Sequence, residues 1–152
     1  MASDAEFEQF VRTVDRPLRQ ALVAALGSVL GEDAHAAALA YAWEHQDAVM
    51  AMAWPVAYLV RVGRSSTRHR RRPLPPIYAR PAEMPDFEPG LASALAGLPE
   101  KLRVPLFLTV GCDWSYAETA RLLGSRESTI RARVQRGLAS IRRELGVTER
   151  DD

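Results

Sequence analysis

The chain has 152 residues, of which 47% are hydrophobic and 26% are charged, and its formal net charge is +1. This composition is ordinary for a folded globular protein, and it excludes a wholly disordered or fibrous chain. The single cysteine excludes an internal disulfide, and Met1 is followed by acidic residues instead of the basic start of a secretory peptide, so we expect a cytoplasmic protein.

Charge is strongly ordered along the chain. Residues 1–60 carry eight acids against three arginines, and residues 61–82 carry seven arginines and no acid. Residues 83–100 hold four acids and no base, and residues 101–152 hold ten bases against seven acids. Two cationic segments separated by acidic ones predict two surfaces for an anionic polymer.

Four helices are predicted between Phe7 and about Arg72, because apolar residues recur there at the spacing that gives a helix one buried face. The first is expected to pause at Pro17, and the second to end where Gly31 interrupts the apolar run. That run, Ala21–Leu30, has the length of a core helix, and no stretch is both long and charge-free enough to cross a bilayer.

The third predicted helix covers residues 33–49, and the fourth begins near Pro55, a residue favoured in the first turn of a helix. Each of the last three helices is expected to bury one face. The inward residues would be Leu18, Leu22, Leu26, Val29 and Leu30 in the second, Leu39, Ala42 and Trp43 in the third, and Tyr58, Leu59 and Val62 in the fourth.

A proline-rich segment, residues 73–90, follows the arginines at the end of the fourth helix. It contains six prolines and one glycine, which disfavour both helix continuation and sheet pairing. The sequence therefore predicts an all-α protein with two small helical domains, residues 1–72 and 91–152, joined by a Pro-rich acidic linker at residues 73–90.

Helical patterns return after the linker and form a helix-turn-helix. Ser115 and Glu118 have the spacing of a capping box, Gly124 ends the short helix that follows, and Ser125 is expected to begin a longer one. A short capped helix, a glycine turn and a longer arginine-rich helix are typical of a DNA-binding helix-turn-helix domain.

The last helix has two unlike faces when its residues are placed about 100° apart. The apolar side consists of Ile130, Val134, Gly137, Leu138 and Ile141. The opposite side consists of Ser128, Ala132, Gln135, Arg136 and Ala139, flanked by Thr129, Arg131 and Arg133. Small residues permit close approach to the major groove, Gln and Arg can pair with bases, and flanking arginines suit phosphates.

The chain resembles bacterial sigma factors of the extracytoplasmic-function (ECF) type, members of the sigma-70 family. The carboxyl-terminal half carries LPEKLRVPLFLTV and then DWSYAETARLLGSRESTIRARVQRGLASIRREL, which look like the fourth region, the part that reads the −35 promoter element. The amino-terminal half carries LGEDAHAAALAYAWEH and PVAYLVRVGRSSTRHRRR, which resemble the second region. The resemblance covers nearly the whole chain.

This resemblance implies three sets of functional residues. Contacts to −35 DNA would come from Ser128, Thr129, Arg131, Ala132, Arg133, Gln135 and Arg136. Contacts to −10 DNA would come from Trp54, Arg61, Arg64, Ser65, Arg68, Arg70, Arg71 and Arg72. Binding to core RNA polymerase would come from Asp33, Ala36, Ala37, Leu39 and Trp43.

Two segments depart from the family's pattern. Ala36 and Ala37 stand where the polymerase-binding helix usually carries Gln and Glu, and Ser65 and Ser66 replace the Asn and the apolar residue usual in the promoter-melting helix. His69 replaces an Asp in the same helix. These departures predict weakened polymerase binding and altered promoter opening.

Three functions fit the sequence. The first is an alternative sigma factor that binds core polymerase and directs promoter-specific initiation, with promoter DNA and an anti-sigma or other regulatory protein as further partners. The second is a degenerate sigma-like regulator that binds polymerase, a sigma factor or an anti-sigma protein without initiating alone. The third is a stand-alone helix-turn-helix repressor. The sequence predicts no enzyme activity, cofactor or membrane partner. Glu32 and His35 have the spacing of half a di-iron site, but no metal site is predicted because the further ligands are missing.

Overall fold

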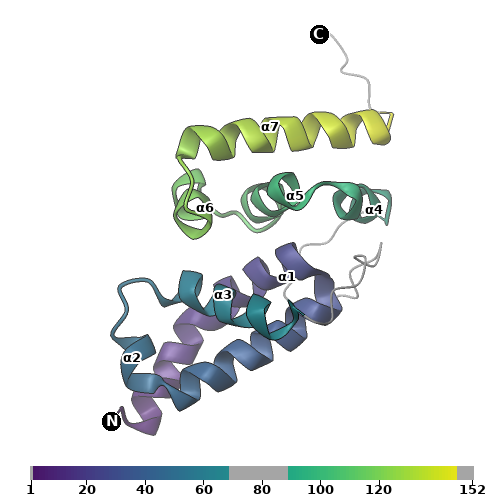
Figure 1. Cartoon of the computed structure of the whole chain (residues 1–152). Helices are drawn as coiled ribbons and strands as arrows, with labels where there is room; N and C mark the ends of the chain where they lie inside the picture. Colours follow the sequence, from purple (N-terminus) through teal and green to yellow (C-terminus); the bar gives the residue numbers. More distant parts are fainter. Residues whose placement is uncertain (1, 69–88, 147–152) are drawn as a thin grey trace. The chain divides into compact units, whose positions relative to one another are not determined.

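The computed structural model describes residues 2–68 and 89–146, and these residues form helices and no strand (Figure 1). The all-α fold predicted from the sequence is therefore confirmed. The chain divides into two compact units, an amino-terminal unit, Met1–Pro73, and a carboxyl-terminal unit, Leu74–Asp152.

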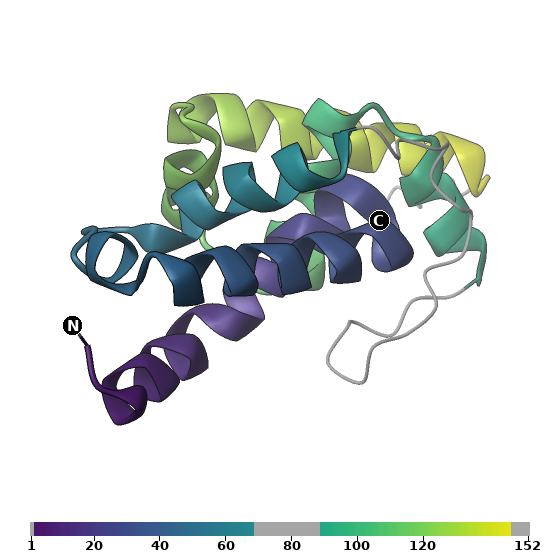
Figure 2. The same cartoon turned by 60° about the horizontal axis from the view of Figure 1, so that its bottom comes forward.

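The amino-terminal unit contains α1 (Asp4–Glu44), α2 (Gln46–Met50) and α3 (Pro55–Ser66). α1 is a hairpin of two helical arms joined by a bend at Gly27, whose φ of 81° and ψ of 173° lie in a region open essentially to glycine alone (Figure 2). The arms run antiparallel, since the Ala2 amide donates to Asp47 Oδ1 at 3.1 Å and the Phe7 and Trp43 rings lie 5.0 Å apart.

The position of the bend corrects the sequence prediction. The helix continues through Pro17, where a pause was expected, because Val14 and Leu18 on either side are fully buried and hold it in place. Gly31, expected to interrupt the second helix, lies inside the second arm, where a Cβ would be 2.7 Å from the Cα of Val23. Gly31 thus permits close approach of the arms instead of ending a helix.

The apolar run of α1 is core. By length and composition α1 does contain a stretch that could cross a membrane, contrary to the sequence prediction, but 61% of that stretch is buried inside the unit. Ala21 to Ser28 are all buried. The bend folds the apolar run back into the protein.

α3 covers the hairpin and closes the core of the amino-terminal unit. Leu18, Leu22 and Leu59 have no exposed surface. α3 lies so close to the second arm that a Cβ at Gly63 would be 2.9 Å from the Ala34 carbonyl oxygen.

Two residues predicted to face inward are exposed. Val29 is 63% exposed just beyond the bend, and Trp43 is 51% exposed. The second arm instead buries alanines, Ala34, Ala38 and Ala42, because small residues allow the helices to approach closely. Leu39, Tyr58 and Val62 are half-buried at the edges of the core.

The carboxyl-terminal unit contains α4 (Pro89–Gly97), α5 (Glu100–Leu106), the π-helix η2 (Phe107–Gly111), α6 (Tyr116–Leu123) and α7 (Glu127–Glu144). α4 begins inside the predicted linker, and residues 73–88 of that linker lie outside the described residues. α5 and α7 form the core, and Gly137 allows their close approach because a Cβ there would lie 3.2 Å from Leu106 Cδ2.

Candidate nucleic-acid interface

The entry to the helix-turn-helix is fixed by a reciprocal cap. The Ser115 hydroxyl accepts a hydrogen bond from the Glu118 amide at 3.0 Å, and the Glu118 carboxylate accepts one from the Ser115 amide at 2.9 Å. α6 ends at Gly124, which has φ 61° and ψ 35°, the left-handed conformation typical of a helix C-terminus. The capping box and the glycine turn predicted from the sequence are confirmed.

α7 begins two residues later than expected, with Arg126 at its N-cap and Glu127 as its first residue. Its apolar side is buried as predicted, with only Leu138 at the half-buried margin. The exposed residues of the opposite side are Ser128, Ala132, Gln135, Arg136 and Ala139. The packing of α7 on α5 therefore leaves one continuous polar face uncovered in the carboxyl-terminal unit.

The flanking residues of that face differ in exposure. Arg131 is exposed, whereas Thr129 and Arg133 are half-buried. Arg131 places its guanidinium carbon 5.2 Å from the centre of the Tyr116 ring, and Arg136 Nε donates to the Ala132 carbonyl at 3.4 Å. Tyr116 was not singled out from the sequence, because only the packing of α6 against α7 brings it near an arginine.

The first cationic segment lies on and after α3. Arg61, Ser65 and Arg68 are exposed, and Arg64 and Trp54 are half-buried, with Trp54 at the N-cap of α3. His69 and the three arginines Arg70, Arg71 and Arg72 lie outside the described residues.

A groove in the amino-terminal unit lies between α3 and the second arm of α1. Its lining consists of Tyr41, Tyr58, Arg61, Val62, Ser65 and Ser66. The two tyrosine hydroxyls are 2.9 Å apart, and this hydrogen bond raises the pKa of Tyr41 above its usual 10.0. Tyr41 could not be identified from the sequence, because its partner Tyr58 lies 17 residues away on another helix. Aromatic and cationic side chains in one groove are suited to bases and phosphates of single-stranded DNA.

The residues predicted to bind polymerase share the second arm of α1. Asp33, Ala36 and Trp43 are exposed, and Ala37 and Leu39 are half-buried. The structure thus brings the predicted residues to one accessible helix, while the Trp43 and Phe7 rings pack against each other in a T-shaped arrangement.

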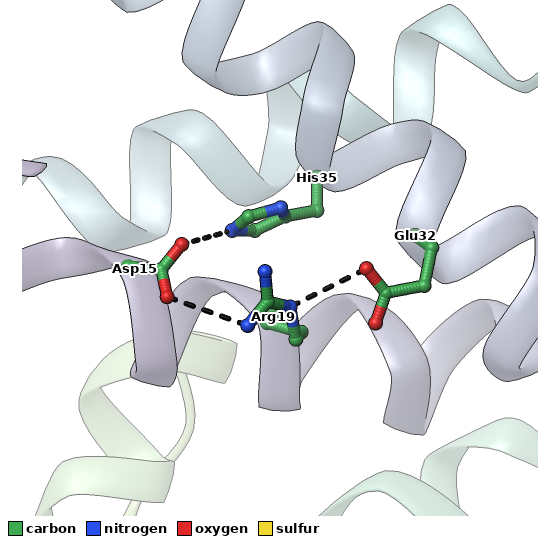
Figure 3. A network of polar contacts seen from close by, with 4 residues as sticks. All are labelled: Asp15, Arg19, Glu32 and His35. Carbon is green, nitrogen blue, oxygen red and sulfur yellow. Dashed lines mark hydrogen bonds and ion pairs between the residues drawn. The ribbon is translucent and has the colours of Figure 1, made fainter. Parts of the chain in front are cut away.

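A network of four polar side chains joins the two arms of α1 (Figure 3). His35 Nε2 lies 2.9 Å from Asp15 Oδ1, and Arg19 contacts Asp15 Oδ2 at 3.4 Å and Glu32 Oε2 at 3.3 Å. The His35 side chain is only 6% exposed. Glu32 therefore contacts Arg19, and His35 contacts Asp15.

Comparisons with known proteins agree with the geometry. Residues 90–141 match the family model described as Sigma-70, region 4. The sigma factor RpoE of Bartonella quintana, solved in complex with the anti-sigma factor NepR, has a similar structure with a TM-score of 0.67 and 24% identity. The match covers 95% of this chain and 98% of that chain. A search of curated proteins found no match. The resemblance to region 4 predicted for the carboxyl-terminal half is confirmed over residues 90–141, and the likeness to RpoE confirms the fold.

Proposed function

We propose that this chain, whose carboxyl-terminal unit contains a sigma-70 region 4 domain and whose fold is that of a sigma factor, is an alternative sigma factor of the ECF type. It would bind core RNA polymerase and direct promoter-specific initiation. The amino-terminal unit would hold −10 DNA and the carboxyl-terminal unit would read the −35 element. The protein would work in the cytoplasm and would not be an enzyme.

The observation that carries this proposal is the uncovered face of α7 within the region 4 match. Its centre is the small residue Ala132, which lies between the polar residues Ser128, Gln135 and Arg136, and all four are exposed. Gln and Arg side chains form bidentate pairs with base edges in the major groove. The Gly124 turn and the packing of α7 on α5 and α6 hold this helix in a fixed orientation.

The amino-terminal unit supports the second half of the proposal. Arg61 and Arg68 are exposed on the same segment as the groove that Tyr41 and Tyr58 line. Arginines would bind the phosphates of the melted strand, and an aromatic edge would contact its bases. Arg70, Arg71 and Arg72 are proposed to extend this surface on sequence grounds alone.

Polymerase and an anti-sigma protein are the proposed protein partners. Asp33, Ala36, Ala37, Leu39 and Trp43 would form the polymerase contact, with Trp43 as its large apolar side chain. An anti-sigma partner is proposed because RpoE of Bartonella quintana was solved with one.

Run-off transcription with reconstituted core polymerase tests the function directly. Genomic DNA fragments serve as templates, and core polymerase alone is the control. Discrete transcripts that require this protein would support an alternative sigma factor. Their absence, together with retained binding to core polymerase, would contradict initiation.

A second function is favoured by the alanines of the polymerase-binding arm. Ala36 is exposed and Ala37 is half-buried where the family usually carries Gln and Glu, and the exposed Ser65 and Ser66 replace residues of the melting helix. These changes would fit a regulator that binds polymerase, a sigma factor or an anti-sigma protein without initiating alone. Pull-down with each of the three partners separates this regulator from a stand-alone repressor, which would bind none.

A further inference from the structure

The cation–π contact between α6 and α7 pairs one exposed arginine with one ring. Arg131 Cζ lies 5.2 Å from the centre of the Tyr116 ring, within the range at which an aromatic face attracts a guanidinium. Arg131 lies on the second turn of α7, directly after the fully buried Ile130. The burial of Ile130 fixes the helical position from which the Arg131 side chain leaves.

Tyr116, which supplies the ring, lies within the N-terminal cap of α6. Tyr116 is the first residue of α6, directly after Ser115, and the Ser115–Glu118 capping box fixes the backbone on either side of it. Thr119 Oγ1 also donates to the Ser115 carbonyl at 2.9 Å. These bonds fix the backbone of Tyr116. Its side chain is half-buried, so part of the ring stays accessible.

An aromatic partner leaves an arginine available to DNA. A carboxylate would accept the N–H groups of Arg131 and compete with phosphate, whereas a ring attracts the cation and leaves hydrogen-bond donors for another acceptor. A free arginine side chain loses rotamer freedom when it binds, and a partner that already orders it reduces that loss.

We propose that Tyr116 is a positioning residue that orders the Arg131 guanidinium for a DNA phosphate beside the exposed face of α7. This inference rests on the proposed function and adds a residue of α6 to the interface. Because the contact is to phosphate, its effect is expected on every DNA sequence alike.

The test compares Tyr116→Leu with Tyr116→Phe in the full chain, using a fluorescein-labelled duplex of mixed sequence at several salt concentrations. Tyr116→Leu should weaken binding about two- to fivefold, the range of an exposed cation–π contact, and Tyr116→Phe should bind like the wild type. The salt slope should stay unchanged in Tyr116→Leu, because the phosphate contact remains, whereas Arg131→Ala should lower that slope by about one.

The double variant Tyr116→Leu/Arg131→Ala should bind like Arg131→Ala alone, since the ring acts only through the arginine. A loss of the same size from Tyr116→Leu in the Arg131→Ala background would overturn the proposal and assign Tyr116 a structural role. Weak binding by Tyr116→Phe would also overturn it and assign the hydroxyl a direct contact to DNA.

A measurement without DNA separates this inference from the proposed function. The side-chain protons of Arg131 should show an upfield ring-current shift in the nuclear magnetic resonance spectrum of the wild type and of Tyr116→Phe, and lose it in Tyr116→Leu. No such shift in the wild type would overturn the positioning role even if the protein binds DNA. A shift in a protein that binds no duplex would leave the contact intact and contradict both the proposed function and the role in DNA binding.

Discussion

The longest helices of the two units, α1 and α7, use charged side chains in different ways. α1 joins its two arms through Asp15, Arg19, Glu32 and His35, of which only His35 is buried, and it exposes an alanine, Ala36, on its outer surface. The carboxyl-terminal unit places most of the arginines of α7 on the surface. Charged side chains in α1 therefore help to join two arms of one helix, whereas Arg131 and Arg136 of α7 remain accessible to a ligand.

The largest expected effect is the loss of stability on replacing Gly27, compared with Gly124, the glycine at the turn between α6 and α7. Gly27 has ψ 173°, a conformation essentially restricted to glycine, whereas Gly124 has the left-handed conformation that Asn also adopts. Gly27→Asn should lower the free energy of unfolding by about 1–3 kcal/mol and Gly124→Asn by less than about 1 kcal/mol. Urea unfolding followed residue by residue with nuclear magnetic resonance measures each unit. Equal losses would contradict the difference between the turns.

The second expected effect is a loss of DNA binding when the exposed face of α7 is changed. Arg136→Ala should cost about 1–3 kcal/mol of binding to a duplex selected by the wild type, if Arg136 reads a base. Titration of selected and scrambled duplexes measures the discrimination. Arg143→Ala, about two turns further along α7, is the matched control. Equal weakening of both duplexes by Arg136→Ala would make it a phosphate contact only.

A substitution in the partly buried network should lower stability more than a substitution in an exposed ion pair on the same helix. Asp15→Asn should lower the free energy of unfolding by about 1–2 kcal/mol, less than for a fully buried pair because the Asp15 side chain is 31% exposed. Glu8→Gln is the control, since the Arg12–Glu8 pair is about two-thirds exposed and should change stability by less than about 0.5 kcal/mol. Thermal unfolding of both variants measures the difference. Similar values would show that the network contributes no more than a surface pair.

Polar residues added to the outer surface of α1 should strengthen its binding to core polymerase. Ala36→Gln together with Ala37→Glu should improve binding to core polymerase, by about 1 kcal/mol for each new charge-assisted hydrogen bond. Competition with a housekeeping sigma factor for limiting core polymerase measures it. Ala48→Glu adds a charge on another exposed position as the control. Unchanged binding would place the polymerase contact elsewhere on the unit.

The smallest effect concerns acid sensitivity at the start of α1. The Ser3 amide, and then the Ser3 hydroxyl, hold the pKa of Glu6 below its usual 4.5 by hydrogen bonding to its carboxylate. This contribution to stability is fully present above pH 4.5 and is lost as the pH falls through the lowered value. Ser3→Ala should raise the pKa of Glu6 toward 4.5, which a carboxyl titration by nuclear magnetic resonance would detect. An unchanged pKa would assign the whole effect to the amide.

Sequence reasoning succeeded where the signal is local. Ser115, Glu118 and Gly124 lie within ten residues, and each acts through its own backbone neighbours, so the helix-turn-helix could be predicted with its buried and exposed faces. The composition and helical spacing were also sufficient for an all-α fold.

The shape of α1 could not be predicted in the same way. Ala21 to Ser28 are buried on every side, so the apolar run has no periodicity that would mark a bend at Gly27. The pairing of Asp15 with His35 and of Tyr41 with Tyr58 depends on tertiary packing between residues 17 or more positions apart. The contact of Tyr116 with Arg131, 15 positions apart, likewise depends on the packing of α6 against α7.

The bend at Gly27 also sets an order in which the hairpin can form. Contacts between its arms enclose progressively longer segments: Arg19 with Glu32 near the bend, then Asp15 with His35, and Phe7 with Trp43 at the open end. Because the entropy lost on closing a segment grows with its length, contacts near the bend cost least to make first. The hairpin is therefore a low-contact-order element that can fold rapidly from Gly27 outward, and its open end, where Phe7 meets Trp43, is the part expected to open first.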